Sequence, residues 1–196
     1  ESSLLDSATV FQTVNGHERI YMMPYRPGMI MWQLSFPLSE EDARKLNAQG
    51  PGAMKNEALK RLALWHDPIP QIITHTEESL ITGYPVYDRE VMGPELLKDT
   101  ESITLIGDAV HPMSPFKGQG ANQALLDALS LARKISIECR DSQWRDEGLR
   151  ALVLNGFEKD MMSRVTSKVR GSRTAADLLH SDSVLREGDA PRGRGV

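Results

Sequence analysis

The run LIGDAVHPMSPFKGQGANQALLDA at 105–128 gathers the residue types of this 196-residue chain that are best suited to hold a ligand. Asp108 directly follows a short apolar run, and an ionised carboxylate accepts hydrogen bonds from hydroxyl groups such as those of a polyol. Gly118 and Gly120 carry no Cβ, so the backbone can approach a ligand closely there. The residue types and their order predict a ligand-binding loop between a strand and a helix.

Regular elements on both sides must position this loop. The run SITLIG at 102–107 is short and continuously apolar, which predicts a buried strand of a parallel sheet, and open α/β sheets bind ligands at the carboxyl ends of their strands. A predicted helix over 122–138 would aim its unpaired N–H groups and the positive end of its dipole at the ligand. Its wide apolar stripe predicts burial on more than one side. Further helices are expected over 144–169 and near 174–180.

The first third of the chain reads as β-rich. Asn15-Gly16 predicts a hairpin turn between two apolar stretches, and Pro27-Gly28 leads into a third. Ser39, followed by three acidic residues, predicts a helix start. A second helix is expected over 53–65, and SLITGYPVYD at 79–88 resembles a further strand. The predicted fold is α+β with an α/β part: antiparallel strands first, then a strand–loop–helix unit.

Three regions follow from this pattern. Residues 1–88 form a β-rich region, residues 89–180 carry the loop and the long helices, and residues 181–196 are polar and glycine-rich, which predicts a mobile tail. No internal repeat occurs in the sequence.

Composition excludes several classes of protein. The formal net charge is -4 and the pI about 5.8, whereas nucleic-acid binders usually carry a basic excess, so no nucleic-acid partner is expected. No apolar run reaches the roughly 18 residues of a membrane helix, and no signal-peptide pattern occurs. The single cysteine, Cys139, fits a reducing compartment, and a cytoplasmic location is expected.

Familiar phosphate and metal motifs do not explain the loop. The dinucleotide fingerprint GxGxxG would need a third glycine at position 123, which is Gln123, and it should follow its strand directly. No Gly-Lys-Ser or Gly-Lys-Thr sequence forms a P-loop. The five histidines lack ligand spacing, so no metal site is predicted.

The run GDAVHPMSPFKGQGANQALLDALSLA at 107–132 resembles the second flavin-binding motif of the FAD-dependent aromatic hydroxylases, the group that includes para-hydroxybenzoate hydroxylase. That motif is roughly GDAxHxxxPxxGxGxNxxxxDAxxLA, and the residues Gly107, Asp108, Ala109, His111, Pro115, Gly118, Gly120, Asn122, Asp127, Ala128, Leu131 and Ala132 match it. YPVYDRE at 84–90 and the N-terminal strands give weaker support.

The resemblance implies roles for the loop. Asp108 would bind ribityl hydroxyls of FAD, Pro115 would line the reaction side of the ring, and His111 is expected to brace the loop rather than act as an acid or base. The expected cofactor-binding residues are Gly107, Asp108, Pro115, Gly118, Gln119, Gly120, Ala121 and Asn122. A substrate pocket would be lined by Tyr21, Met23, Trp32 and Gln33. Strand alternation would place Tyr21 and Met23 on one face, so at most one set can face a ligand.

The function implied is that of the C-terminal portion of an FAD-dependent monooxygenase that uses NAD(P)H and oxygen to hydroxylate a small, aromatic substrate. The alternatives are another FAD-linked oxidoreductase, such as an epoxidase, halogenase or reductase, and a non-catalytic interaction module. The family's N-terminal GxGxxG and its Asp-Gly segment do not occur in the sequence. The resemblance therefore implies a partner, the missing Rossmann first half of the same chain, and a homodimer is a further possibility. The 196 residues alone are expected to bind FAD weakly or not at all, and to be inactive.

Overall fold

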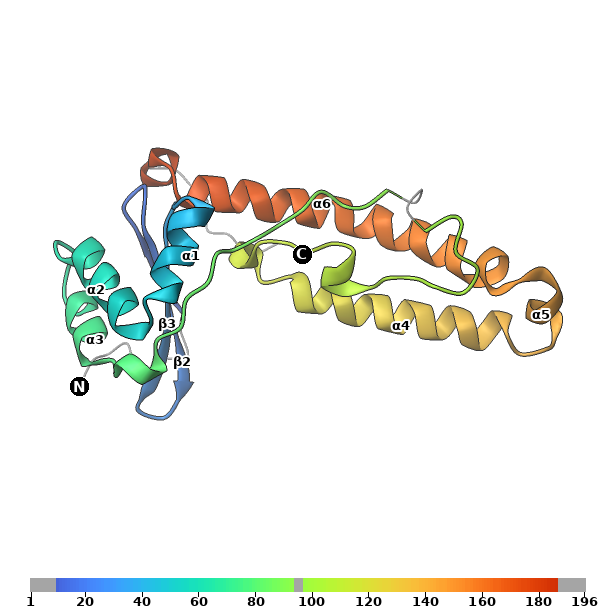
Figure 1. Cartoon of the computed structure of the whole chain (residues 1–196), viewed down its shortest axis with the longest axis horizontal. Helices are drawn as coiled ribbons and strands as arrows, with labels where there is room; N and C mark the ends of the chain where they lie inside the picture. Colours follow the sequence, from blue (N-terminus) through green and yellow to red (C-terminus); the bar gives the residue numbers. More distant parts are fainter. Residues whose placement is uncertain (1–9, 94–96, 187–196) are drawn as a thin grey trace. The chain divides into compact units, whose positions relative to one another are not determined.

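The computed structural model describes residues 10–93 and 97–186, which fall into two compact units (Figure 1). The first unit comprises residues 10–85 and 177–186, and the second comprises the described part of 86–176. Each unit has its own cluster of buried apolar side chains.

A three-stranded antiparallel sheet in the order β1-β2-β3 opens the first unit, as the sequence predicts. Asn15 and Gly16 lie in the turn between the first two strands. The Asn15 side-chain oxygen accepts hydrogen bonds from the backbone N–H groups of His17 (3.0 Å) and Glu18 (2.7 Å). Gly16 has φ 95°, a left-handed value that favours glycine. The strands are β1 (Phe11–Val14), β2 (Arg19–Arg26) and β3 (Met29–Ser35).

One face of this sheet forms the core of the first unit. Ile20 and Met22 of β2 are buried there and pack against apolar side chains of two helices. The predicted helix start at Ser39 is confirmed, because its hydroxyl accepts a hydrogen bond from the Asp42 N–H (3.1 Å). The helices of this unit are α1 (Glu40–Ala48), α2 (Pro51–Leu62) and α3 (Ile69–His75). The core residues are Ala58 and Leu62 of α2 and Ile69 and Ile73 of α3.

The predicted mobile tail lies only partly within the described residues. Residues Asp182–Leu185 form a 3₁₀ turn, and a Cβ built on Gly16 would lie 2.6 Å from the Asp182 Oδ1 atom. His180 lies 2.9 Å from the Ser35 hydroxyl. This turn therefore packs on the first hairpin, while residues 187–196 lie outside the described residues.

The second unit consists mainly of helices joined by irregular segments. The predicted helix over 122–138 is confirmed. The expected single helix over 144–169 is wrong, because Gly148 takes the left-handed value φ 88° and breaks it. The short helix expected near 174–180 is the end of a longer one. The elements are α4 (Gly120–Glu138), α5 (Gln143–Glu147), a π-helical turn (Arg150–Leu154) and α6 (Asn155–Leu179).

Helices α4 and α6 run side by side in the second unit (Figure 1), and ion pairs join Asp127 to Arg164 (2.6 Å) and Lys134 to Asp160 (3.1 Å). A small buried cluster of Val110, Phe157, Met161 and Val165 lies along α6. In α4 the buried residues are Gln123 and Asp127. The expectation that α4 is buried on more than one side is wrong, since much of its apolar stripe is exposed: Leu125, Leu126, Leu129, Ile135 and Ile137.

Two predicted strands are absent. Residues 103–106 are not part of a sheet, and Ile103 is 59% exposed. A strand needs a neighbour to satisfy its backbone N–H and C=O groups, and the described residues of the second unit contain no other strand. The run 79–88 begins in a 3₁₀ turn at Glu78–Leu80 and continues without regular structure, and its glycine and proline disfavour a strand. The α+β class is confirmed by the antiparallel sheet and the helices, while the Rossmann part stays a prediction.

Candidate functional site

The turn that carries Asp108 packs closely against α4. Residues Gly107–Ala109 form a 3₁₀ turn, and Gly107 has φ 60°. A Cβ built on Gly107 would lie 3.2 Å from the Cβ of Ala124, so both the backbone conformation and the close approach require glycine there. The Asp108 side chain is exposed and makes no hydrogen bond or ion pair with another described residue. Its carboxylate is therefore available to an external donor.

The carboxylate of Asp108 lies beside the start of α4. A Cβ built on Gly120, the first residue of the helix, would lie 4.0 Å from Asp108 Oδ1. No side chain caps this helix start, so N–H groups of its first turn are left without a side-chain partner. Ala121 and Asn122 are exposed in the same turn. A hydroxyl acceptor and a group of N–H donors thus lie next to each other.

Between these two parts the loop is held by short turns and keeps unpaired polar atoms. Pro115 opens a 3₁₀ turn that ends at Gly118, whose N–H donates to the Pro115 carbonyl oxygen (2.9 Å) at φ 61°. Pro115 is exposed, and a Cβ built on Gly118 would meet nothing within 4 Å. The Ser114 hydroxyl and the Gln119 side-chain oxygen are buried without a hydrogen-bond partner among the described residues. The loop therefore combines exposed backbone at Pro115 and Gly118 with two buried polar atoms that have no partner among the described residues.

A buried network behind the loop centres on Asp127, which is 0% exposed. Its Oδ2 atom accepts hydrogen bonds from the Gly107 N–H (2.8 Å) and from His111 Nε2 (2.6 Å). Its Oδ1 atom accepts one from Arg164 Nη2 (2.6 Å), while Arg164 Nη1 donates to Gln123 Oε1 (2.7 Å). Burial alone would raise the pKa of the Asp127 carboxyl. The hydrogen bonds from Arg164, Gly107 and His111 outweigh burial and hold that pKa below its ordinary value.

His111 belongs to this network rather than to the open side of the loop. Its side chain is 0% exposed. A carboxylate only accepts hydrogen bonds, so His111 Nε2 is a protonated ring nitrogen and donates the hydrogen bond to Asp127. The other ring nitrogen, Nδ1, is buried without a partner among the described residues. This place favours the bracing role expected for His111 over acid–base chemistry.

A second set of contacts reaches the loop from residues 88–90. Arg89 Nη2 donates to the Ala109 carbonyl oxygen (2.8 Å), next to Asp108. The flanking acids pair with Arg173 of α6, at 2.7 Å for Asp88 Oδ1 and 2.5 Å for Glu90 Oε1. Hydrogen bonds to Asp88 and Glu90 raise the pKa of the Arg173 guanidinium above its ordinary value, so it stays protonated.

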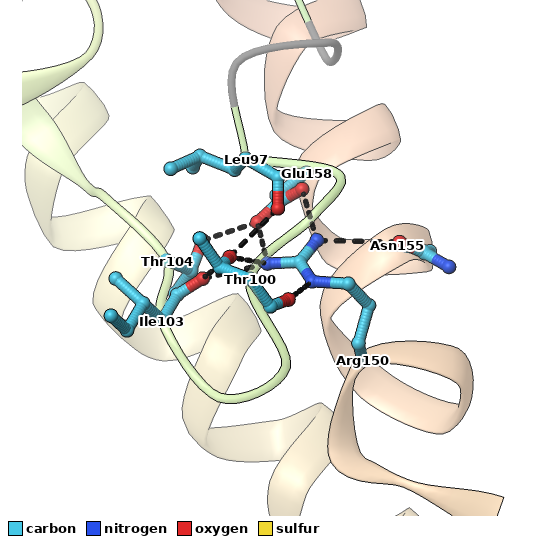
Figure 2. Close-up of polar contacts among 7 residues, drawn as sticks. All are labelled: Leu97, Thr100, Ile103, Thr104, Arg150, Asn155 and Glu158. Carbon is cyan, nitrogen blue, oxygen red and sulfur yellow. Dashed lines mark hydrogen bonds and ion pairs between the residues drawn. The ribbon is translucent and has the colours of Figure 1, made fainter.

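The segment that leads into the loop is fixed by Arg150, as Figure 2 shows. Its guanidinium donates to the carbonyl oxygens of Thr100 and, at 2.6 Å, of Ile103. It also pairs with Glu158 Oε2 (3.0 Å), and the Thr104 hydroxyl donates to Glu158 Oε1 (2.8 Å). Arg150 is 13% and Glu158 4% exposed. This polar cluster anchors residues 100–104 to the start of α6. The sequence predicts that this segment leads into a paired strand over 102–107, but side-chain contacts hold it instead.

The four expected substrate-pocket residues lie in the first unit and divide between the two faces of the sheet. Tyr21 pairs with Gln33 across the strands, so these two and Met23 share one face. Trp32 pairs with Met22 on the other face, packs against the core cluster and donates to the Thr76 hydroxyl (3.0 Å). Trp32 is thus a core residue, while Tyr21 and Met23 are half-buried and Gln33 is exposed.

Two classes of site are absent from the described part of the chain. Residues 10–93 and 97–186 contain no group of three or more His, Cys, Asp or Glu side chains that could hold a metal ion. No helix in those ranges is both long and apolar enough to cross a membrane.

Comparisons with known proteins find sequence similarity in the region of this loop. Residues 95–149 match the family model of the FAD binding domain. An aurachin C monooxygenase/isomerase of Stigmatella aurantiaca is 42% identical over 84 residues, which is 43% of this chain and 21% of that protein. A 3-amino-4-hydroxybenzoate 2-monooxygenase of Streptomyces platensis is 32% identical over 180 residues, 92% of this chain and 40% of that protein. The zeaxanthin epoxidase of Arabidopsis thaliana is 30% identical over 154 residues, 79% of this chain and 20% of that protein.

Residues 95–149 are thus similar to an FAD binding domain, and the chain is similar to monooxygenases. The resemblance seen in the loop sequence is thereby confirmed, and FAD is confirmed as the cofactor of the family. The chain spans between a fifth and two fifths of the length of these relatives.

Proposed function

We propose that this chain supplies the ribityl- and ring-binding part of the FAD site of a monooxygenase. The observation that carries this proposal is the exposed, unpaired Asp108 carboxylate beside the uncapped start of α4. A flavin presents hydroxyl groups on its ribityl chain and polar atoms on its ring edge. The acceptor and the donors of the loop match these two features.

Each part of the loop has a defined task toward the cofactor. Asp108 accepts hydrogen bonds from ribityl hydroxyls. The N–H groups at Gly120, Ala121 and Asn122, with the positive end of the α4 dipole, favour negative charge on the ring edge that they face. Pro115 gives a rigid apolar wall, and Gly118 leaves room for the ring. When bound, FAD supplies the redox and oxygen chemistry, and the protein supplies orientation, electrostatics and exclusion of water.

A second observation supports FAD as the ligand of this loop. The Ser114 hydroxyl and the Gln119 side-chain oxygen are buried without partners among the described residues. Buried polar atoms usually have a hydrogen-bond partner. A ligand with several polar atoms that enters this loop would satisfy them.

The proposed partner of the second unit is an ADP-binding segment with a parallel sheet. The sequence lacks the GxGxxG that binds the pyrophosphate in such segments. The exposed apolar side chains of α4 and of Ile103 and Ile106 are those that a sheet would cover. The described chain therefore binds flavin weakly by itself, and turnover requires the partner segment and NAD(P)H.

The proposed reaction is hydroxylation of a small aromatic substrate. Its support is the relative from Streptomyces platensis, whose named substrate, 3-amino-4-hydroxybenzoate, is an aromatic acid. In the first unit, Tyr21, Met23 and Gln33 share the sheet face that is not used for the core, and they are the proposed substrate-facing residues. Trp32 is no longer included, because it serves the core.

Epoxidation is the second candidate reaction, because the zeaxanthin epoxidase of Arabidopsis thaliana matches 79% of this chain. Hydroxylation and epoxidation both insert one oxygen atom and use the same cofactor site, so the loop does not distinguish them. The third candidate is a non-catalytic module that pairs with itself or with another chain through the exposed apolar face of α4.

A chimera tests the proposed function. The matching segment of the Streptomyces platensis relative is replaced by this chain, and NAD(P)H consumption is followed with FAD, oxygen and candidate aromatic and olefinic substrates. Retained FAD with oxygen-dependent NAD(P)H oxidation is the expected result. A folded chimera that oxidises no NAD(P)H would favour the non-catalytic module, and turnover of olefins alone would favour epoxidation.

A further inference from the structure

The residues on either side of Asp108 each have one backbone group that is held by a side chain from a distant part of the second unit. On the N-terminal side, the Gly107 N–H donates to Asp127 Oδ2 (2.8 Å). On the C-terminal side, the Ala109 carbonyl oxygen accepts from Arg89 Nη2 (2.8 Å). The Asp108 side chain itself makes no such contact with a described residue. The place of its carboxylate therefore depends on the backbone that carries it.

Each of these two contacts leads back to an arginine of α6. Arg164 donates to Asp127 (2.6 Å), whose side chain is 0% exposed. Arg173 pairs with Asp88 (2.7 Å), next to Arg89 in the chain. Hydrogen bonds to charged groups are stronger and more directional than neutral ones. The turn is consequently tied to one helix by two chains of charged contacts.

Backbone hydrogen bonds add to the contact between Arg89 and the turn. The Arg89 N–H donates to the Pro112 carbonyl oxygen at 3.4 Å, a long contact. The N–H groups of Val110 and His111 both donate to the Gly107 carbonyl oxygen (3.0 Å each), which closes the turn on itself. Arg89 therefore contacts the backbone around the turn at Ala109 and Pro112, whereas Asp127 contacts it at Gly107.

We propose that Arg89 and Asp127 are positioning residues that set the place of the Asp108 carboxylate for the hydroxyl groups of the cofactor, an inference that rests on the proposed function. A binding site gains affinity when its polar groups are held in the bound geometry before the ligand arrives. An unpaired, exposed carboxylate gains this order from a fixed backbone. Asp127 fixes it at Gly107, and Arg89 fixes it at Ala109.

Arg89 gives the cleaner test, because its side chain is exposed and its removal opens no cavity. Arg89→Met removes the donor to Ala109, and Arg89→Lys keeps a cation that can still donate. Asp127→Asn is the second variant. Because Asp127 is buried and can be required for folding, the Arg89 pair keeps the proposal testable if that variant unfolds.

The first measurement needs no flavin. Amide hydrogen exchange of the 196-residue chain is followed by NMR. Arg89→Met is expected to speed exchange at Val110 and His111 by roughly tenfold, the value of a lost hydrogen bond to a charged group. Arg89→Lys should restore slow exchange, and the amides of α6 near Val165 should not change. Unchanged exchange in the turn of Arg89→Met would overturn the proposal.

The second measurement compares riboflavin, which carries the ribityl hydroxyls, with lumiflavin, which has the ring alone. Both are titrated by fluorescence. Arg89→Met should lower the preference for riboflavin by roughly tenfold and leave lumiflavin binding unchanged, and Arg89→Lys should restore the preference. An equal loss for both flavins would mean a merely structural role and would overturn the proposal.

The background variant Asp108→Ala, which removes the hydroxyl acceptor, makes the two failures distinguishable. In that background, Arg89→Met should have no further effect on the riboflavin preference, because the group that it positions is gone. A further loss would show that Arg89 acts by another route. If the unmodified chain binds lumiflavin as tightly as riboflavin, the proposed function fails. If it binds neither flavin, the weak affinity expected of the chain without its partner segment accounts for that result. In both cases the exchange measurement still decides whether Arg89 orders the turn.

Discussion

Different kinds of contact stabilise the interior of each of the two units. The first unit has an apolar core in which one sheet face packs on α2 and α3, with Ile20, Leu62 and Ile73 almost fully buried. The second has a small apolar cluster around Phe157 and relies on buried charges, chiefly Asp127 with Arg164 and Arg150 with Glu158. The apolar stripe of α4 is largely exposed there.

This difference indicates what each unit is built for. A domain usually buries its helix stripes against another layer, and the first unit does so. In the described part of the second unit no layer covers the apolar stripe of α4, and ion pairs fix a loop in which Asp108 and Pro115 are exposed. Buried ion pairs add little net stability but impose specific geometry when their partners are complete. The second unit therefore resembles one side of a binding site more than a complete core.

The largest expected effect is in the apolar clusters. Phe157→Ala should destabilise the second unit by about 3–5 kcal/mol, because a fully buried ring is lost and a cavity remains. Leu62→Ala is the matched change in the first unit, with an expected cost of about 2–5 kcal/mol. Amide exchange reports on each unit separately. Loss of protection confined to residues 10–85 in Phe157→Ala would contradict the division into two cores.

Asp127 should make the stability of the second unit depend on pH. Its pKa is below the ordinary value in the folded chain, so the carboxylate stabilises the fold above the unfolded pKa of about 4. That stability is lost as the pH falls through the lower, folded pKa. Asp127→Asn should cost about 3 kcal/mol at neutral pH and should flatten this acid dependence in unfolding curves. The exposed Asp146 is the control, and an equal flattening in Asp146→Asn would contradict the assignment.

The polar cluster of Figure 2 should contribute less per hydrogen bond. Thr104→Val removes the donor to Glu158 (2.8 Å), and Glu158 keeps Arg150 as a partner. The expected cost is about 1 kcal/mol, measured by chemical denaturation. Thr174→Val removes an exposed hydroxyl on α6 and should stay within about 0.5 kcal/mol of the parent. If the two variants are equally stable, residues 100–104 are not held by this cluster.

The smallest effect is expected on the exposed stripe of α4. Leu125→Gln and Leu129→Gln should change the stability of the chain by no more than about 0.5 kcal/mol, since both side chains are exposed. Leu131→Gln, on the side packed against the Phe157 cluster, should cost about 2 kcal/mol. A cost for Leu125→Gln as large as that for Leu131→Gln would remove the contrast between the two sides of α4.

Local features of the fold were predictable from the sequence because local chemistry dictates them. Ser39 caps its helix, Gly16 and Gly28 adopt the turns expected of glycine, and α4 begins within two residues of the predicted start. The strand predicted over 102–107 failed because apolar composition does not reveal whether a pairing strand is available. The burial of α4 was overpredicted for the same reason, since both depend on a neighbouring layer.

The candidate site was predictable on its ligand side and hidden on its supporting side. Asp108, Pro115 and the glycines are close in sequence, so their types and spacing carry the signal. Arg164 lies 37 residues from Asp127, and Arg173 lies 85 residues from Asp88, so no short motif joins them. Trp32 packs against the core cluster because it stands opposite Met22 in the pairing of β2 with β3, and no short motif reveals that pairing.

FAD retention by the chimera tests the central claim, that Asp108 binds the ribityl chain, most directly. Asp108→Ala and the control Asp146→Ala are introduced into it, and flavin absorbance per protein is measured after extensive dialysis. The account predicts that Asp108→Ala loses FAD while Asp146→Ala retains it, because only the first removes a hydroxyl acceptor at the loop. Equal flavin content in the two variants would contradict the assignment of this loop to the cofactor.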